Sequence, residues 1–166
     1  MLKRLAGFGL KQWLLLALGV LALDQITKHG IELSFNKGES LTVIPGFFNL
    51  TLAYNPGAAF SFLADAGGWQ RHFFTALALG VSAYIVVLLK KHQHETRFAL
   101  ALAMILGGAI GNAIDRMIFG HVIDFLDFYL GARHYPAFNL ADSAIVGGAA
   151  LIIWDSYRRE KEKPAA

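Results

Sequence analysis

The stretch "RFALALAMILGGAIGNAIDR", residues 97–116, combines a long apolar run with three glycines and ends in polar and charged residues. A helix needs roughly 20 mostly apolar residues to cross a bilayer, and the run over 97–114 is near that length. Gly107, Gly108 and Gly111 remove side chains from the run, so another helix or a substrate can approach it closely. The stretch therefore predicts a membrane-spanning helix with a close-contact face.

Three further apolar blocks lie on either side of this stretch. The four predicted membrane segments cover about 12–28, 69–89, 97–114 and 138–154. The chain of 166 residues is 55% hydrophobic and 16% charged, whereas soluble domains average about 25% charged residues. We therefore expect an all-α membrane protein with four transmembrane helices, formed by residues 1–166 as one domain. The first block has the basic start and apolar core of a signal peptide, but no clear cleavage pattern follows, which favours a retained anchor.

The basic residues gather at the ends of these blocks, which is typical of topology signals and disfavours a nucleic-acid partner. Four spans would place all of these clusters on one side of the membrane, so we expect both termini to be cytoplasmic. The chain has no cysteine, which excludes disulfides, thiol nucleophiles and thiolate metal sites. The clustered residues, ten of the fifteen basic ones, are Lys3, Arg4, Lys11, Lys90, Lys91, Arg97, Arg158, Arg159, Lys161 and Lys163.

Two stretches between the blocks would then face outward, 29–68 and 117–137. The first contains "SLTVIPGFFNLTLAYN", residues 40–55, which alternates apolar and polar residues around a turn. This pattern predicts a small extracytoplasmic hairpin or sheet over about 40–62. The second stretch is short and rich in aromatic residues that suit a membrane interface, and it predicts a short loop or helix.

Several polar residues fall at the predicted outer boundary, where an ionisable group inside the membrane costs at least ~2.5 kcal/mol. Asp24 and Lys28 are four residues apart on one helical face, so they either form an ion pair that closes the helix end or support a site. Asn55 precedes Pro-Gly and is either a turn residue or an amide that orients a substrate. Asp115 is expected to pair with its neighbour Arg116 at a helix contact.

Asp142 has a structural interpretation as a capping residue, whereas Asp124 is harder to explain by structure alone. Asn139 and Asp142 in "NLAD" fit a helix N-cap with an acid at the third position, where the positive end of a helix favours a carboxylate. Asp124 lies among apolar neighbours in "HVIDF", so burial should raise its pKa, and a nearby Asp142 would raise it further. Two carboxylates sharing one proton can activate water for attack on a carbonyl. Asp127 is expected to be only an interfacial charge.

Five short motifs in register resemble the lipoprotein signal peptidase family, and they extend from residue 24 to residue 143. The resemblance implies four transmembrane helices and a membrane aspartic endopeptidase of the bacterial inner membrane. Such an enzyme removes signal peptides from diacylglyceryl-modified prolipoproteins and cuts just before the lipidated cysteine. The motifs are "DQITK" (24–28), "NPGAAFS" (55–61), "GGAIGNAIDR" (107–116), "VIDF" (122–125) and "FNLADS" (138–143).

Matched by motif, the resemblance implies that Asp124 and Asp142 are the catalytic pair. A carboxylate pair needs no metal or cofactor, and one chain carries every motif, so a monomer would suffice. The expected partners are prolipoprotein substrates and membrane lipid, and no nucleic acid. We also expect the substrate's signal helix to lie along the glycine face of 97–114. A small multi-pass transporter or proton-relay protein, or a non-catalytic scaffold, remains an alternative. The residues expected to line or support the site are Asn55, Asn112, Arg116, Asn139, Asp24, Lys28, Asp115 and Gly108.

Overall fold

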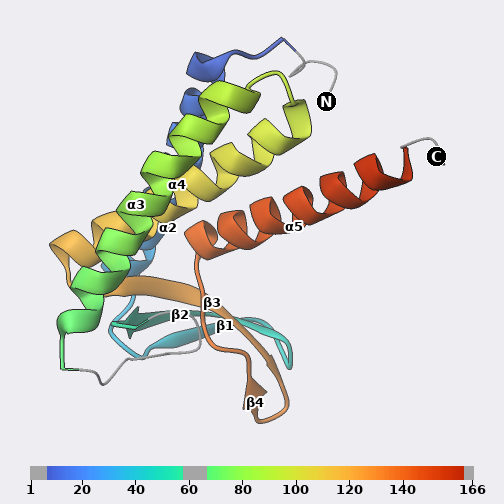
Figure 1. The fold of residues 1–166 in the computed structure, drawn as a ribbon. Helices are drawn as coiled ribbons and strands as arrows, with labels where there is room; N and C mark the ends of the chain where they lie inside the picture. The colour runs from blue at the N-terminus through green and yellow to red at the C-terminus, as the bar shows by residue number, and fades with distance from the viewer. Residues whose placement is uncertain (1–6, 58–66, 163–166) are drawn as a thin grey trace.

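The computed structural model describes residues 7–57 and 67–162. Within them the chain is mostly helical, and each of the four predicted segments forms a helix that is a few residues longer than expected (Figure 1). The prediction of four long helices is confirmed. They are α2 (Leu10–Ser34), α3 (Trp69–His92), α4 (Thr96–Ile118) and α5 (Leu140–Lys161).

Helix α4 is the centre of the bundle and packs against the other three helices. Its glycines make this possible, because a Cβ atom on Gly107 would overlap the backbone of α2 at Ala17. A Cβ on Gly108 would likewise overlap the backbone oxygen of Ala141 in α5. Helices of the same chain therefore fill this face, and the expectation that a substrate helix lies along it is wrong.

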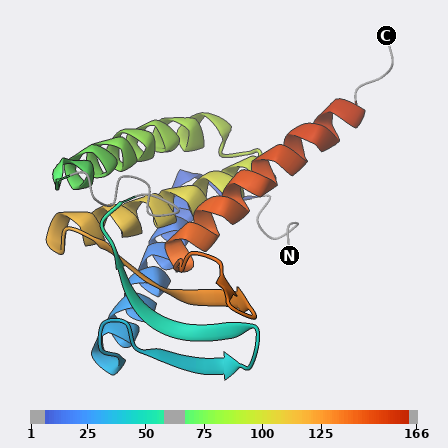
Figure 2. The same ribbon diagram turned by 90° about the horizontal axis from the view of Figure 1, so that it is seen from below.

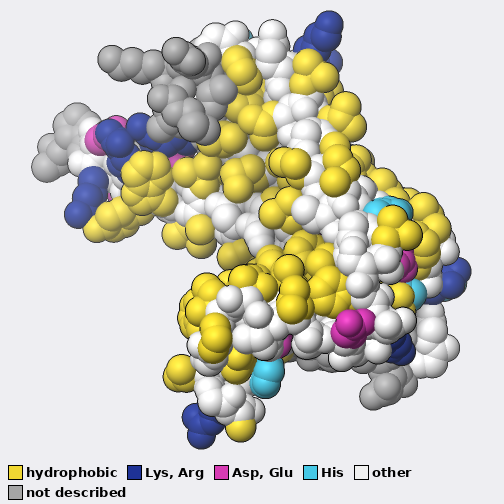
Figure 3. Space-filling model, turned by 180° about the vertical axis from the view of Figure 1, so that it is seen from behind, with side chains coloured by type: hydrophobic (Ala, Val, Ile, Leu, Met, Phe, Trp, Pro, Cys, Tyr) yellow, Lys and Arg dark blue, Asp and Glu magenta, His cyan; other side chains and the backbone are white. Residues whose placement is uncertain are grey.

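Three of the helices, α2, α3 and α4, are long and apolar enough to cross a membrane. Helix α5 has 22 residues, but the aspartates near its two ends, Asp142 and Asp155, lower its hydropathy. Hydrophobic side chains cover much of the surface of the helical part (Figure 3). The protein is therefore a multi-span membrane protein, and a fourth span through α5 stays a prediction.

A four-stranded antiparallel sheet lies at one end of the bundle, with its strands in the order β1-β2-β3-β4 (Figures 1 and 2). The predicted hairpin is confirmed as β1 and β2, and residues 58–62 of its expected range lie outside the described residues. The strands are β1 (Ser40–Ile44), β2 (Phe48–Asn55), β3 (Val122–Leu130) and β4 (Arg133–His134).

The second outward stretch forms strands β3 and β4, so its prediction as a short loop or helix is wrong. Strand β3 pairs with β2, with Asn49 opposite Asp127 and Ala53 opposite Asp124. The first four residues of β3 are all buried. A strand covered on both faces does not show the alternation that identifies a half-exposed strand, which explains the error.

The end of the bundle away from the sheet holds the start of α2, the α3–α4 connection and the last turns of α5 (Figure 1). Basic residues of all three clusters therefore lie at one end, as the charge pattern predicts. Lys3, Arg4 and Lys163 of these clusters are outside the described residues.

Candidate active site

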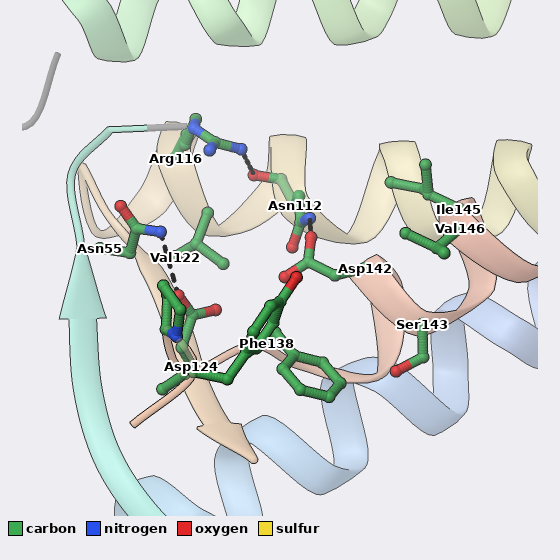
Figure 4. A pocket seen from close by; sticks show the side chains of 13 residues that line it. Asn55, Asn112, Arg116, Val122, Asp124, Phe138, Asp142, Ser143, Ile145 and Val146 are labelled. Carbon is green, nitrogen blue, oxygen red and sulfur yellow. Dashed lines mark hydrogen bonds between the residues drawn. The ribbon is translucent and has the colours of Figure 1, made fainter. Parts of the chain in front are cut away.

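A cavity of about 410 Å³ opens where the end of α4 and the start of α5 meet strands β2 and β3 of the sheet (Figure 4). It brings together four of the residues predicted to form or line the site from α4, α5 and β2, together with Asp124 from β3. The lining residues are Asn55, Asn112, Arg116, Val122, Asp124, Tyr135, Pro136, Ala137, Phe138, Asp142, Ser143, Ile145 and Val146.

Asp124 lies near the start of β3 and is only 2% exposed. Its two carboxylate oxygens accept hydrogen bonds from the side-chain amides of Asn55, at 3.0 Å, and Asn139, at 2.8 Å. Burial and the nearby carboxylate of Asp142 raise the pKa of Asp124 from 3.8 to about 7, against the opposing effect of the two amides. At neutral pH this carboxyl group therefore exists in both protonation states.

Asp142 is held by the first turn of α5, and the predicted capping box is confirmed. Asn139 is the N-cap, and its side-chain oxygen accepts the backbone N–H of Asp142 at 2.9 Å. The carboxylate of Asp142 accepts the Asn112 amide at 2.7 Å and lies 3.4 Å from the backbone N–H of Asn139. Because the partial positive charge of the helix start favours an anion, this position suits the ionised form.

Asn139 connects the two aspartates. Its side-chain oxygen caps the helix that carries Asp142, while its amide nitrogen donates to Asp124. Asn139 is fully buried. The helix cap at Asn139, which the sequence predicts, therefore also orients Asp124 and Asp142 toward the same cavity (Figure 4).

Lys28 is fully buried behind the cavity and has three acceptors within 2.9 Å. They are the carboxylates of Asp24 and Asp115 and the side-chain oxygen of Asn112. An ammonium group has three donors, so this set satisfies it fully. The contact turns the Asn112 oxygen toward Lys28 and its NH₂ group toward Asp142.

The prediction that Asp115 pairs with Arg116 is wrong, because Asp115 contacts Lys28 of α2 instead. Arg116 donates to the backbone oxygens of Asn112, at 3.2 Å, and Gly57, at 2.7 Å. Its guanidinium also lies over the ring of Phe74, 5.5 Å from the centroid. Arg116 thus joins α4 to Gly57 of the "NPGAAFS" motif. Residues 58–61 of this motif are outside the described residues.

Asp24 and Gly108 lie outside the lining of the cavity and act on its frame. Asp24 accepts the backbone N–H of Ala141 at 2.9 Å, which ties α2 to the first turn of α5. Gly111 leaves room for this carboxylate, and Gly108 leaves room for the backbone of α5. These residues therefore hold the start of α5, and with it Asp142, against α4.

The sequence did not identify the apolar wall of the cavity, which includes residues 135–138 and Ile145 and Val146 of α5. Nor did it identify the surroundings of Asp127, which is 7% exposed and contacts Asn49 and His134, so its interpretation as an interfacial charge is wrong. These contacts join different strands, and no spacing in the sequence indicates them.

Among the described residues, no cluster of three or more His, Cys, Asp or Glu side chains could hold a metal ion.

The raised pKa of Asp124 predicts that the free energy of unfolding depends on pH. The folded protein holds a proton on this group between about pH 4 and pH 7 that the unfolded chain releases, so the contribution of Asp124 to stability falls as the pH rises. Asp124→Asn removes this loss. The unfolding free energy of the variant minus that of the wild type should grow by up to about 4 kcal/mol from about pH 4 to about pH 8.

Unfolding in detergent at a series of pH values measures this difference, and any constant effect of the substitution cancels. Asp142→Asn is the matched comparison. It removes the charge next to Asp124 but leaves Asp124 buried, so the unfolding free energy of this variant should depend on pH less steeply than that of the wild type but should still fall as the pH rises. A difference for Asp124→Asn that stays flat with pH would contradict the assignment of the raised pKa.

The fold and the site together define a multi-span membrane protein in which two aspartates share a cavity at the sheet end of a helical bundle. The chain belongs to the signal peptidase II family, because the family described as "Signal peptidase (SPase) II" matches residues 16–158. A lipoprotein signal peptidase of Burkholderia mallei (strain SAVP1) is 57% identical over 158 residues, 95% of each chain. One of Cupriavidus taiwanensis is 59% identical over 150 residues, 90% of this chain and 85% of the relative.

Solved structures share the fold. A bacterial membrane enzyme determined by the in meso method at 2.3 Å resolution superposes with a TM-score of 0.82 at 34% identity, covering 94% of this chain and 95% of that one. A second bacterial membrane enzyme, determined by the same method at 1.9 Å, gives a TM-score of 0.77 at 33% identity over 87% and 92%. The family expected from the five motifs is confirmed.

Proposed function

We propose that this signal peptidase II cleaves prolipoproteins with Asp124 and Asp142 as its catalytic pair. The observation that carries the proposal is the convergence of the two carboxyl groups on one cavity, with burial and mutual repulsion raising the pKa of Asp124 to about 7. A pair of carboxyl groups whose environments differ can divide the acid and base roles between them. The family supplies the reaction, hydrolysis of a signal peptide.

In this mechanism Asp142 is the ionised member and Asp124 the protonated one. Asp142 takes a proton from water as the water oxygen bonds to the scissile carbonyl carbon, and Asp124 gives its proton to the carbonyl oxygen. In the second step the C–N bond breaks, Asp142 returns its proton to the leaving nitrogen, and Asp124 regains one from the diol. Each aspartate ends in its starting state.

The surrounding amides keep these roles distinct. Asn112 and the start of α5 donate to Asp142, which stabilises its anion. Asn55 and Asn139 orient Asp124, one from each side. Arg116 lines the same cavity and supplies a positive charge for the oxygen that becomes negative in the transition state.

The proposed substrate is a diacylglyceryl-modified prolipoprotein, cut just before the lipidated cysteine. The apolar wall formed by Val122, Phe138, Ile145 and Val146 suits a chain segment that enters from lipid. We further propose that α5 is the fourth span and that both termini are cytoplasmic, in the bacterial inner membrane. The basic residues at the end away from the sheet support this orientation, in which the cavity would lie near the outer face.

Cleavage by the purified full-length chain in detergent tests the function. A lipidated prolipoprotein should be cut at least about tenfold faster, in kcat/KM, than the same precursor without its diacylglyceryl group, because the apolar part of the substrate contributes binding energy. Mass spectrometry of the products identifies the cleaved bond. Failure to cut the lipidated precursor, or equal rates on both forms, would contradict the proposal.

A further inference from the structure

Asp127 takes no part in the proposed mechanism, although it lies on the same strand as Asp124. It is 7% exposed, and a buried carboxylate is costly unless it is paired and hydrogen-bonded. The register of the sheet places Asn49 of β2 directly opposite it. The contacts of Asp127 should therefore show why a carboxylate is stable at this buried position.

Those contacts join three strands. The Nδ1 atom of His134 in β4 lies 2.8 Å and 3.0 Å from the two carboxylate oxygens of Asp127. The amide of Asn49 in β2 donates to one of the same oxygens at 2.8 Å. The ring of His134 also stacks on Tyr129 of β3, with the centroids 5.0 Å apart and the planes within 10°. One carboxylate thus fixes both the position and the orientation of the His134 ring.

The chain that follows His134 forms a wall of the active-site cavity. Residues 135–138 line the cavity and run back along β3, with the Tyr135 N–H donating to Phe128 at 2.8 Å and the Phe138 N–H donating to Leu126 at 3.1 Å. Strand β4 has only two residues. Phe138 also accepts the backbone N–H groups of Phe125 and Leu126, so backbone hydrogen bonds to β3 are concentrated at the end of the segment. The His134–Asp127 contact adds a side-chain contact where the segment begins.

We propose that the His134–Asp127 contact is a latch that holds residues 135–138 in place as a substrate-binding wall. His134 and Asp127 are positioning residues: they act through the wall and do not touch the reacting atoms. This inference rests on the proposed function for the substrate, whereas the latch itself is a property of the hairpin. Loss of the latch loosens the wall, which weakens substrate binding while the dyad and its Asn139 cap stay in place.

The test uses His134→Ala in the full-length chain, since His134 is half exposed and its loss leaves the core intact. Hydrogen exchange at the Tyr135 and Phe138 amides should become about tenfold faster, with the amides of the first turn of α5 unchanged. With the lipidated prolipoprotein, KM should rise about fivefold or more while kcat changes by less than about twofold.

Two variants control the test. His134→Asn places an N–H donor where Nδ1 lies and should restore both exchange and KM to near wild-type values. Arg133→Ala removes the exposed neighbour of His134 on β4 and should change neither. Unchanged exchange in His134→Ala would overturn the latch, and faster exchange with an unchanged KM would overturn its role in substrate binding. An inactive wild-type enzyme would instead refute the proposed function, while the exchange result would still decide on the latch.

Discussion

Asparagine in place of either Asp124 or Asp142 is expected to lower kcat for the lipidated prolipoprotein by at least about a thousandfold, as is typical when one member of a catalytic set is removed. The reason differs for the two positions. Asp142→Asn removes the base that takes the proton from water, and Asp124→Asn removes the acid that protonates the carbonyl oxygen. KM should change little, because neither carboxyl group supplies the apolar surface that binds the substrate.

Single-turnover cleavage with excess enzyme measures this effect without interference from product release. Asp155→Asn is the matched control, since Asp155 is also a buried aspartate of α5 but pairs with Arg97 and Arg159 at the far end of the helix. The kcat of this variant should stay within a few-fold of the wild-type value, because Asp155 lies far from the cavity and shares no partner with the dyad. Turnover within tenfold of the wild type in either dyad variant would refute the pair.

Lys28→Met is expected to give the largest loss of stability. It leaves the carboxylates of Asp24 and Asp115 buried without their shared cation, and breaking such a buried pair costs about 3–5 kcal/mol. For a chain of this size the melting temperature should fall by about 10 °C. Asn112 also loses the contact that orients its amide toward Asp142, so the folded fraction should cleave more slowly.

Thermal unfolding in detergent, followed by circular dichroism, measures the loss. Lys37→Met is the matched control, because Lys37 is exposed and lies over the ring of Tyr54 at the surface. Combining Lys28→Met with Asp24→Asn and Asp115→Asn should recover part of the stability by removing the uncompensated charges. A loss below about 1 kcal/mol for Lys28→Met would show that the buried cluster is not held by its lysine.

The sequence alone determined the parts of this protein that depend on neighbours in the chain. Long apolar runs are sufficient to form long helices, so the four helices were predictable, and the charge pattern correctly gathered the three basic clusters at one end of the bundle. The N-cap of Asn139 with Asp142 needs only one helical turn, and it too was predictable. The five motifs identified the family because their order does not depend on the fold.

The tertiary structure decided every contact between segments that are distant in the chain. Whether the glycine face of α4 receives a substrate or a helix depended on where α2 and α5 pack, and the helices fill it. Lys28 could have paired within its own helix alone, but the approach of α4 adds Asp115 and Asn112 to its partners. Asp127 became a buried partner of His134 only because β2 and β4 flank β3. Burial and strand pairing are properties of the assembled chain, so local patterns could not reveal them.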